Sequence, residues 1–251
     1  MKAIILAAGY ATRMYPLTKE TPKPLLTLGN RTILDHIVND IAVIDDVNEL
    51  YIVSNEKFIG HFQNWHQTVK KDSLYPNVSI FIISDGTTDN ENRLGAIADI
   101  QFAIERFQID DDTLVIAGDN VFTFSFLDIF SFFKKKDAGV IAVKSFDSMK
   151  KLQRSGIVEF DQQKRIIGFE EKPEEPRSTF VAPAFYILKR ESLPLIKAYL
   201  DEENKSDAPG YFISWLIQRR PLYAFEIQNP YYDIGTLEAY QTIQKVFTQS
   251  G

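Results

Sequence analysis

Short apolar runs alternate with amphipathic stretches through the first half of the chain. Isoleucine recurs at helical spacing between Thr32 and Ile44, and Lys57–Lys70 has the pattern of a second helix. Strand and helix patterns that alternate in this way are typical of a parallel, doubly wound sheet. The runs with the length and composition of buried strands are Lys2–Leu6, Glu49–Val53, Val78–Ile83 and Thr113–Ala117.

The second half of the chain is richer in short strands. We predict a hairpin of Gly156–Asp161 with Arg165–Glu170, and helices over 189–203 and 236–248. The fold class is therefore α/β: a Rossmann-like, doubly wound mixed sheet, mostly parallel, with a small β-rich subregion. We expect one domain over 1–251, with parts at about 1–145, 146–235 and 236–248. The further strands are Val140–Val143, Phe180–Leu188 and Leu222–Ile227.

Composition excludes several classes of protein. The formal net charge of −6 argues against a general nucleic-acid binder, which usually carries a basic stripe. The chain has no cysteine, so disulfides, thiolate metal sites and cysteine nucleophiles are excluded. No apolar run approaches membrane-spanning length, and residues 1–8 have the pattern of a strand rather than of a signal peptide. We expect a cytoplasmic protein that binds no membrane.

The loop after the first predicted strand has the composition of a phosphate-binding loop. Ala7, Ala8 and Gly9 carry little bulk, so their backbone N–H groups can approach a base or phosphate oxygens closely. Arg13 and Lys23 follow, ten positions apart. The planar guanidinium of Arg13 can bind two phosphate oxygens, and the flexible side chain of Lys23 carries a compact positive charge. Neither the Walker pattern nor Gly-x-Gly-x-x-Gly occurs here. An ordinary turn with two solvated cations remains the alternative.

Three other segments allow two interpretations each. Asp119 follows a predicted strand and suits a magnesium ligand or a helix cap. The polar segment Asp85–Arg93 is either a ligand loop, with Asp85, Asn90 and Asn92 as candidates, or a surface turn. Six phenylalanines within Phe122–Phe133 indicate core packing, with the surface of a homodimer as the alternative.

Four motifs in order resemble those of the sugar-phosphate nucleotidylyltransferases, the sugar-nucleotide pyrophosphorylases that include glucose-1-phosphate thymidylyltransferase. The first runs from Leu6-Ala7-Ala8-Gly9 through Thr12-Arg13 to Pro16-Leu17-Thr18, and continues at Pro22-Lys23-Pro24. The others are Gly118-Asp119-Asn120, Glu171-Lys172-Pro173 and Asp233-Ile234-Gly235-Thr236. They span nearly the whole chain.

The resemblance implies a GT-A-like nucleotidyltransferase fold and transfer of a nucleotidyl group from dTTP, UTP or CTP to a sugar-1-phosphate, with Mg²⁺, for nucleotide-sugar and polysaccharide synthesis. Residues 1–145 would bind the nucleotide, and residues 146–235 the sugar phosphate. Arg13 and Lys23 would be catalytic, and Asp119 and Asp233 would hold the metal. Nucleotide contacts would come from Leu6, Ala7, Ala8, Gly9, Asn90, Gly95 and Asp119, and sugar-phosphate contacts from Gly156, Glu171, Lys172 and Tyr186.

The chain departs from the family pattern at several positions, which keeps rival functions open. Ala11 replaces the usual second glycine, a base-reading glutamine is missing from 85–93, and the sugar-pocket pattern is altered at Ser155, Pro183–Ala184 and 207–215. The rivals are a cytidylyltransferase for a phosphorylated alcohol such as choline phosphate, and a non-catalytic regulatory homologue. A glycosyltransferase would need an Asp-x-Asp metal motif, and Asp110–Asp112 precedes a strand rather than following one. We expect no C-terminal β-helix region.

Overall fold

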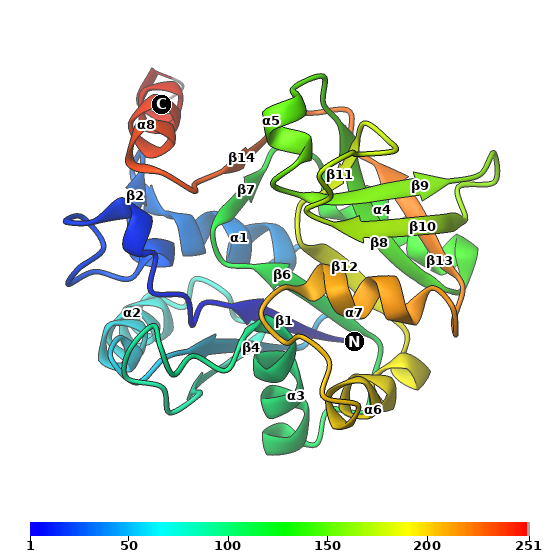
Figure 1. Cartoon of the computed structure of the whole chain (residues 1–251). Coiled ribbons are helices and arrows are strands. Elements are labelled where there is room, and N and C mark those ends of the chain that lie inside the picture. The colour runs from blue at the N-terminus through cyan, green and yellow to red at the C-terminus, as the bar shows by residue number, and fades with distance from the viewer. Residues whose placement is uncertain (250–251) are drawn as a thin grey trace.

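The computed structural model describes residues 1–249, and one large sheet runs through it (Figure 1). Its strands are β1 (Lys2–Leu6), β4 (Glu49–Ser54), β5 (Ser79–Ser84), β6 (Thr113–Ala117), β8 (Gly139–Ser145), β9 (Gly156–Phe160), β10 (Ile166–Glu171), β11 (Phe180–Ala182), β12 (Phe185–Leu188) and β13 (Leu222–Glu226). They follow the order β10-β9-β11-β8-β12-β6-β1-β4-β5, and β13 pairs with β8. The strands β6, β1, β4 and β5 are parallel, whereas β12, β11, β9 and β10 join by antiparallel pairing. The predicted mixed α/β fold class is confirmed.

Helices cover both faces of this sheet, because successive strand residues point to opposite sides. Ile5 and Ile52 belong to one hydrophobic core, and their neighbours Ile4 and Val53 belong to the other. None of the helices within residues 1–249 is long and apolar enough to span a bilayer. The first core includes residues of α1 (Ile33–Ala42), α2 (Ile59–Lys71), α4 (Phe126–Lys136) and α8 (Leu237–Gln249), and the second includes residues of α3 (Ala96–Phe107), α6 (Pro194–Asp201) and α7 (Pro209–Leu216).

The segment predicted as one strand over Phe180–Leu188 forms two. Pro183 cannot donate a ladder hydrogen bond, and Ala184 adopts a left-handed backbone with φ of +51°. The chain therefore leaves β11, which pairs with β8 and β9, and enters β12, which pairs with β6 and β8. The predicted single strand was wrong at this point. The break holds Pro183 close to β7 (Asn120–Phe122), where the Asn120 side chain donates to the Pro183 carbonyl at 2.7 Å.

The phenylalanine-rich segment packs into the core. Five of its six phenylalanines are buried, and Phe132 is partly buried against the same cluster. Phe126 contacts Phe185 of β12 edge to face, with ring centroids 4.8 Å apart. The interpretation as core packing is confirmed, so these rings do not form a surface for a second copy of the chain.

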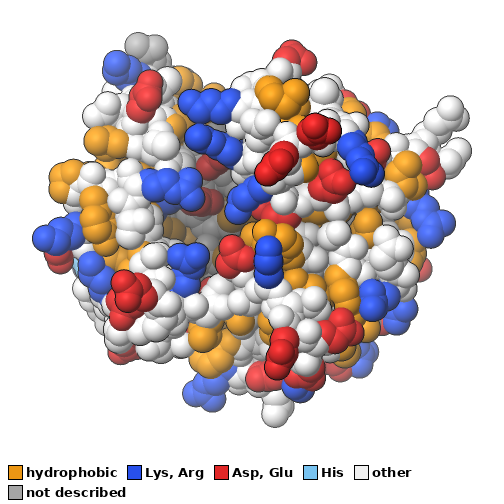
Figure 2. All heavy atoms as spheres, in the orientation of Figure 1, with side chains coloured by type: hydrophobic (Ala, Val, Ile, Leu, Met, Phe, Trp, Pro, Cys, Tyr) orange, Lys and Arg blue, Asp and Glu red, His pale blue; other side chains and the backbone are white. Residues whose placement is uncertain are grey.

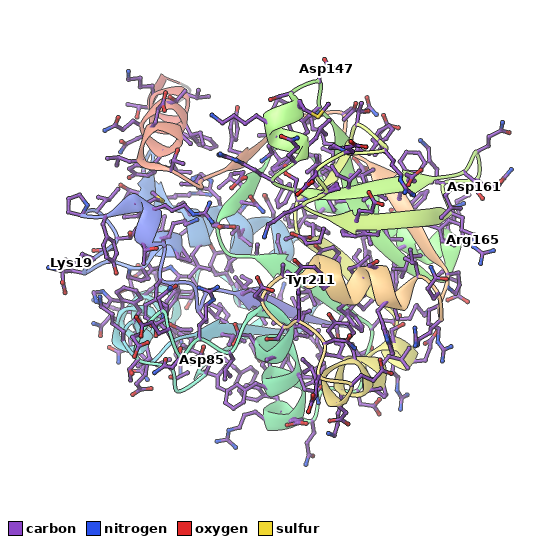
Figure 3. All side chains as sticks on the ribbon, in the orientation of Figure 1. Lys19, Asp85, Asp147, Asp161, Arg165 and Tyr211 are labelled. Carbon is purple, nitrogen blue, oxygen red and sulfur yellow. The ribbon has the colours of Figure 1, made fainter. Side chains whose placement is uncertain are left out.

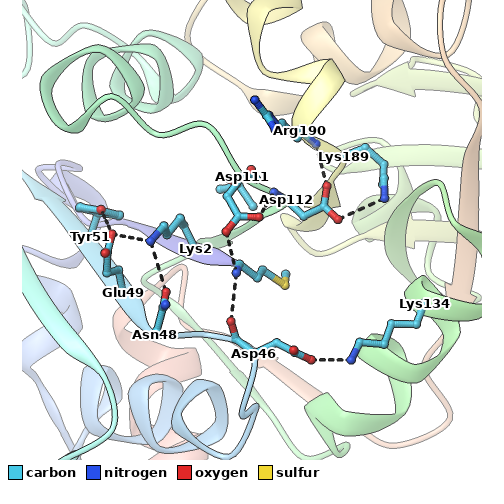
Figure 4. Close-up of polar contacts among 12 residues, drawn as sticks. Lys2, Asp46, Asn48, Glu49, Tyr51, Asp111, Asp112, Lys134, Lys189 and Arg190 are labelled. Carbon is cyan, nitrogen blue, oxygen red and sulfur yellow. Dashed lines mark hydrogen bonds and ion pairs between the residues drawn. The ribbon is translucent and has the colours of Figure 1, made fainter.

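Ion pairs tie together the amino ends of the parallel strands (Figure 4). The N-terminal ammonium contacts Asp111 at 2.8 Å, and Lys2 contacts Glu49 at 2.8 Å. Asp112 accepts from the backbone N–H of Arg190 at 2.8 Å. Because Asp110–Asp112 precede β6, this acidic run lies at the end of the strands opposite to their carboxyl ends. The metal motif of a glycosyltransferase would belong at the carboxyl ends.

Candidate active site

A cavity of about 900 Å³ opens at the carboxyl ends of β1 and β6. Figure 2 shows lysine and arginine side chains around a hollow on this face of the molecule. Residues from all four sequence motifs line the wall, together with three positions of the polar loop, Asp85, Asn90 and Arg93. The sequence-predicted residues that line it are Leu6, Ala7, Ala8, Gly9, Arg13, Lys23, Asp85, Asn90, Gly95, Asp119, Lys172 and Asp233.

The first loop is held in place by backbone hydrogen bonds to both neighbouring strands. The Ala7 N–H donates to the carbonyl of Val53 at 2.8 Å, and the Gly118 N–H donates to that of Leu6 at 2.9 Å. A Cβ atom at Gly118 would stand 2.9 Å from the Leu6 carbonyl oxygen, so only glycine lets the two segments approach this closely. The small residues thus bring the loop against the segment that carries Asp119.

The backbone conformation at Ala11 is one that glycine adopts more easily, which accounts for the glycine that the family usually has at this position. The Ala11 φ of +48° lies in the left-handed region, directly before the 3₁₀ helix η1 (Thr12–Met14). The hydroxyl of Thr18 donates to the Ala11 carbonyl at 2.8 Å, and the Met14 N–H donates to the same oxygen at 2.9 Å. These bonds stabilise the turn that presents Arg13 to the cavity.

A short antiparallel pair of strands brings two aspartates together at the cavity. Asp119 directly precedes β7, and Asp233 ends β14 (Tyr231–Asp233), which pairs with β7. The N–H of Ile234 donates to the Asp119 carbonyl at 3.1 Å. Each carboxylate is bound by a lysine through Oδ2: Lys23 at 2.8 Å from Asp119, and Lys151 at 2.7 Å from Asp233.

The structure decides against a helix cap at Asp119, and it shows Thr236 rather than Asp233 capping the last helix. A strand rather than a helix follows Asp119, and the N–H of Ala239 donates to the Thr236 hydroxyl at 3.2 Å at the start of α8. The two carboxylates are 37% and 43% exposed and share the cavity wall. Within residues 1–249 no group of three His, Cys, Asp or Glu residues could hold a metal. Two carboxylates beside a cavity lined by lysine and arginine are the donor set that Mg²⁺ uses with substrate phosphates.

The residues expected to contact the sugar divide into two groups. Lys172 lies on the wall, with its Nζ 3.4 Å from Oε1 of Glu171. Glu171, Gly156 and Tyr186 are not among the wall residues. Tyr186 belongs to the second core and is 4% exposed, and burial raises the pKa of the Glu171 carboxyl. Gly156 leaves room for the Phe169 ring and that carboxyl, since a Cβ would stand 2.6 Å from Phe169 Cζ.

Four further cations that the family motifs do not include line the same wall: Arg93 of the polar loop, and three that lie close together in the chain. Lys150 and Lys151 belong to the short helix α5 (Met149–Leu152), and Arg154 follows it. The Lys151 N–H donates to the hydroxyl of Ser148, which caps this helix. A signal was present in the sequence, because Lys150, Lys151 and Arg154 are spaced for one face of a helix. Seven cationic side chains line the cavity: Arg13, Lys23, Arg93, Lys150, Lys151, Arg154 and Lys172.

A pair of buried carboxyl groups, Asp85 and Asp99, also reaches the wall. Asp85 follows β5 and is labelled in Figure 3, and Asp99 lies in the first half of α3. Burial and the neighbouring carboxyl of Asp85 raise the pKa of Asp99 to about 8, and burial also raises the pKa of Asp85. Asp85 was a sequence candidate, whereas Asp99 has no signal in the sequence beyond being a polar residue among apolar helix positions.

Comparisons with known proteins agree with this geometry. The family model described as Nucleotidyl transferase matches residues 2–250. The bifunctional protein GlmU of Methanocaldococcus jannaschii is 28% identical over 239 residues, which cover 94% of this chain and 51% of GlmU. The chain thus spans about half the length of that curated relative.

Solved structures share the fold across the whole chain. A UDP-glucose pyrophosphorylase complexed with UDP-glucose has a TM-score of 0.82 at 18% identity, covering 100% of this chain and 99% of the other. The UDP-glucose pyrophosphorylase of Acinetobacter baumannii has a TM-score of 0.76 at 19% identity, covering 98% of this chain and 92% of the other. At these identities the likeness concerns the fold. With the family match over residues 2–250, the chain belongs to the nucleotidyl transferase family.

Proposed function

We propose that the protein transfers a nucleotidyl group from a nucleoside triphosphate to a sugar-1-phosphate, releasing pyrophosphate and forming a nucleotide sugar in a Mg²⁺-dependent reaction. The observation that carries this proposal is the convergence of Arg13, Lys23, Lys172 and two aspartates, from four separate motifs, on one cavity. A polyanionic substrate pair requires such a concentration of positive charge. The family match and the homology to GlmU support the reaction class.

The proposed reaction needs positioning and charge neutralisation more than covalent help. An oxygen of the acceptor phosphate attacks the α-phosphorus, and the bond from that phosphorus to the oxygen bridging to the β-phosphate breaks. Arg13 stabilises the charge on the leaving pyrophosphate, because a guanidinium stays protonated and can bind two oxygens. Lys23 neutralises charge near the α-phosphate, and Lys172 fixes the attacking phosphate.

Asp119 and Asp233 would hold the magnesium ion, which supplies Lewis-acid stabilisation of the triphosphate when bound. Lys23 and Lys151 keep the two carboxylates at the cavity wall through their ion pairs. Lys151 would therefore act together with Arg13, Lys23 and Lys172 in neutralising the charge of the substrate phosphates.

A phosphorylated alcohol is the second candidate acceptor. It is favoured by the position of Glu171 and Tyr186, which the resemblance assigns to the sugar and which lie off the cavity wall. An acceptor without sugar hydroxyls would not need these two side chains.

Pyrophosphate release tests the proposal. We would cross five nucleoside triphosphates with a panel of sugar-1-phosphates and choline phosphate, with Mg²⁺ or with a chelator. Release that depends on one sugar-1-phosphate and on the metal is expected. Release with choline phosphate alone would establish the alcohol phosphate, and no release with any pair would contradict the proposal.

The Arg13→Ala variant tests the proposed role of the Arg13 guanidinium in stabilising the leaving pyrophosphate. Its turnover should fall about a hundredfold, the usual cost of losing a key electrostatic contact to the transition state. Arg106→Ala, on the exposed face of α3, is the matched control and should retain turnover. Near-normal turnover of Arg13→Ala would remove Arg13 from the mechanism.

A further inference from the structure

The carboxyl pair of Asp85 and Asp99 is unusual because both groups are more than nine-tenths buried and yet lie on the cavity wall. Asp85 is 9% exposed and Asp99 is 6% exposed. Asp99 lies on the buried face of α3 together with Ile97 and Ile100. Burying a polar group among apolar residues is costly unless it gains a partner. The two carboxyl groups therefore need hydrogen-bond partners.

Counting donors shows which oxygen atoms of the pair remain available. Oδ1 of Asp85 accepts from the N–H and the hydroxyl of Thr87, both at 2.8 Å. Oδ2 of Asp85 and Oδ1 of Asp99 are buried and receive no donor from residues 1–249. A single proton held between the two carboxyls satisfies both atoms, because one group then donates to the other.

One oxygen of the pair is then left over. Oδ2 of Asp99, unlike Oδ1, is not among the fully buried atoms without a partner, and the Asp99 side chain lies on the cavity wall. With one proton shared between its two carboxyls, the pair as a whole carries one negative charge. The hydroxyls of Tyr10 and Thr87 lie 3.2 Å apart and hold the Asp85 side of the pair in position. The pair thus presents a fixed acceptor to the cavity.

Charge decides which part of a nucleotide can face this acceptor. The negative pair would repel phosphate groups, which belong with the cations of the wall such as Arg13 and Lys23. Two further carboxylates add negative charge at this end of the cavity. Beyond burial, the charge of Glu56 contributes to raising the pKa of Asp85, and the charge of Asp89 contributes to raising the pKa of Tyr10. The uncharged base is the part of a nucleoside triphosphate that suits this end of the cavity.

We propose that Asp85 and Asp99 recognise the base of the nucleoside triphosphate and select one that carries an exocyclic amino group, as cytosine, adenine and guanine do, over uracil and thymine. The amino group donates to Oδ2 of Asp99. A ring carbonyl in the same place would set two acceptors against each other in a site with little water. The base assignment rests on the proposed function, because it places a nucleotide in this cavity.

Nucleotide binding without an acceptor tests the assignment separately from turnover. We would measure dissociation constants by calorimetry for CTP against UTP, and for ATP and GTP against ITP, whose base lacks an amino group. The tightest ligand should carry an amino group and bind at least tenfold more tightly than its amino-free counterpart. Equal binding, tighter binding of UTP or ITP, or no binding of any nucleotide would overturn the proposal.

Two variants at Asp99 test whether the carboxyl pair causes the preference for a base with an amino group. Asp99→Ala removes the acceptor, and the amino preference should fall below threefold. Asp99→Asn keeps a carbonyl oxygen and can donate its N–H to Asp85, so it should keep the preference. Glu105→Gln, on the exposed face of α3, is the control. An unchanged preference in Asp99→Ala would overturn the role of the pair, and if that variant does not fold, the wild-type ratio decides alone.

The two proposals can fail separately. A protein that selects an amino-bearing nucleotide and releases no pyrophosphate with any acceptor contradicts the proposed function and leaves the base assignment intact. Release from UTP with the efficiency of CTP contradicts the base assignment and leaves the function intact.

Discussion

Asp99 carries a carboxyl group inside α3 that holds its proton at neutral pH, and this has a consequence for stability. Its pKa is raised to about 8, first by burial and then by Asp85, whereas an unfolded chain would lose that proton near pH 3.8. The folded state therefore binds the proton more tightly between those values. The stabilisation is complete below about pH 4 and is lost as the pH rises to about 8.

The Asp99→Asn variant removes this titration and keeps a similar shape. Its free energy of unfolding should exceed that of the wild type at pH 8 by on the order of 5 kcal/mol, and the difference should shrink towards pH 4. Denaturant unfolding at several pH values measures this, with Glu105→Gln as the control. A parallel loss of stability in wild type and Asp99→Asn between these pH values would contradict the protonated pair.

Single residues differ in how far the sequence predicts their roles. Arg13, Lys23, Asp119 and Asp233 occur in motifs long enough to be specific, and the structure places all four on one wall. Asp99 could not be found in this way, because its role depends on a neighbour fourteen positions away in the chain. Burial and proximity are properties of the packed structure and leave no local pattern.

At the scale of elements, α5 is the part of the site that sequence motifs miss. It contributes Lys151, whose Nζ contacts Asp233 from the cavity wall. Lys151→Met keeps the apolar stem and removes the charge, so KM for the nucleoside triphosphate should rise about tenfold, the usual cost of a charge-assisted hydrogen bond.

The ion pair is partly exposed, so the same variant should leave the free energy of unfolding nearly unchanged. Steady-state kinetics and a thermal melt measure the two effects. Lys135→Met, exposed on α4, is the matched control. Unchanged kinetics in Lys151→Met would show that α5 does not contact the substrate phosphates.

Elements with a strong hydrophobic pattern follow the prediction closely. Thr113–Ala117 is a strand with the predicted bounds, because it is buried on both faces and every position is small or apolar. The break at Pro183 was missed, since the apolar pattern continues through it. The predicted helix over 189–203 likewise divides, and α6 begins only at Pro194, a residue that favours the first turn of a helix.

At the scale of the whole molecule, the two parts expected at about 1–145 and 146–235 share one sheet. The strand β12 from the second part pairs with β6 of the first, and β14 pairs with β7. These cross-pairings bring Asp233 beside Asp119, although more than a hundred residues separate them. A resemblance in sequence order can predict that such residues belong together, but only the strand pairing positions them.

The fate of the acceptor oxygens tests the central claim most directly. The acceptor found in the pyrophosphate assay would be prepared with ¹⁸O in its phosphate group, and the products would be analysed by mass spectrometry. We predict that the label stays entirely in the nucleotide-linked product, with one labelled oxygen bridging the two phosphorus atoms, and that pyrophosphate is unlabelled. Label in pyrophosphate, or a nucleoside monophosphate formed without a linked product, would contradict nucleotidyl transfer in this cavity.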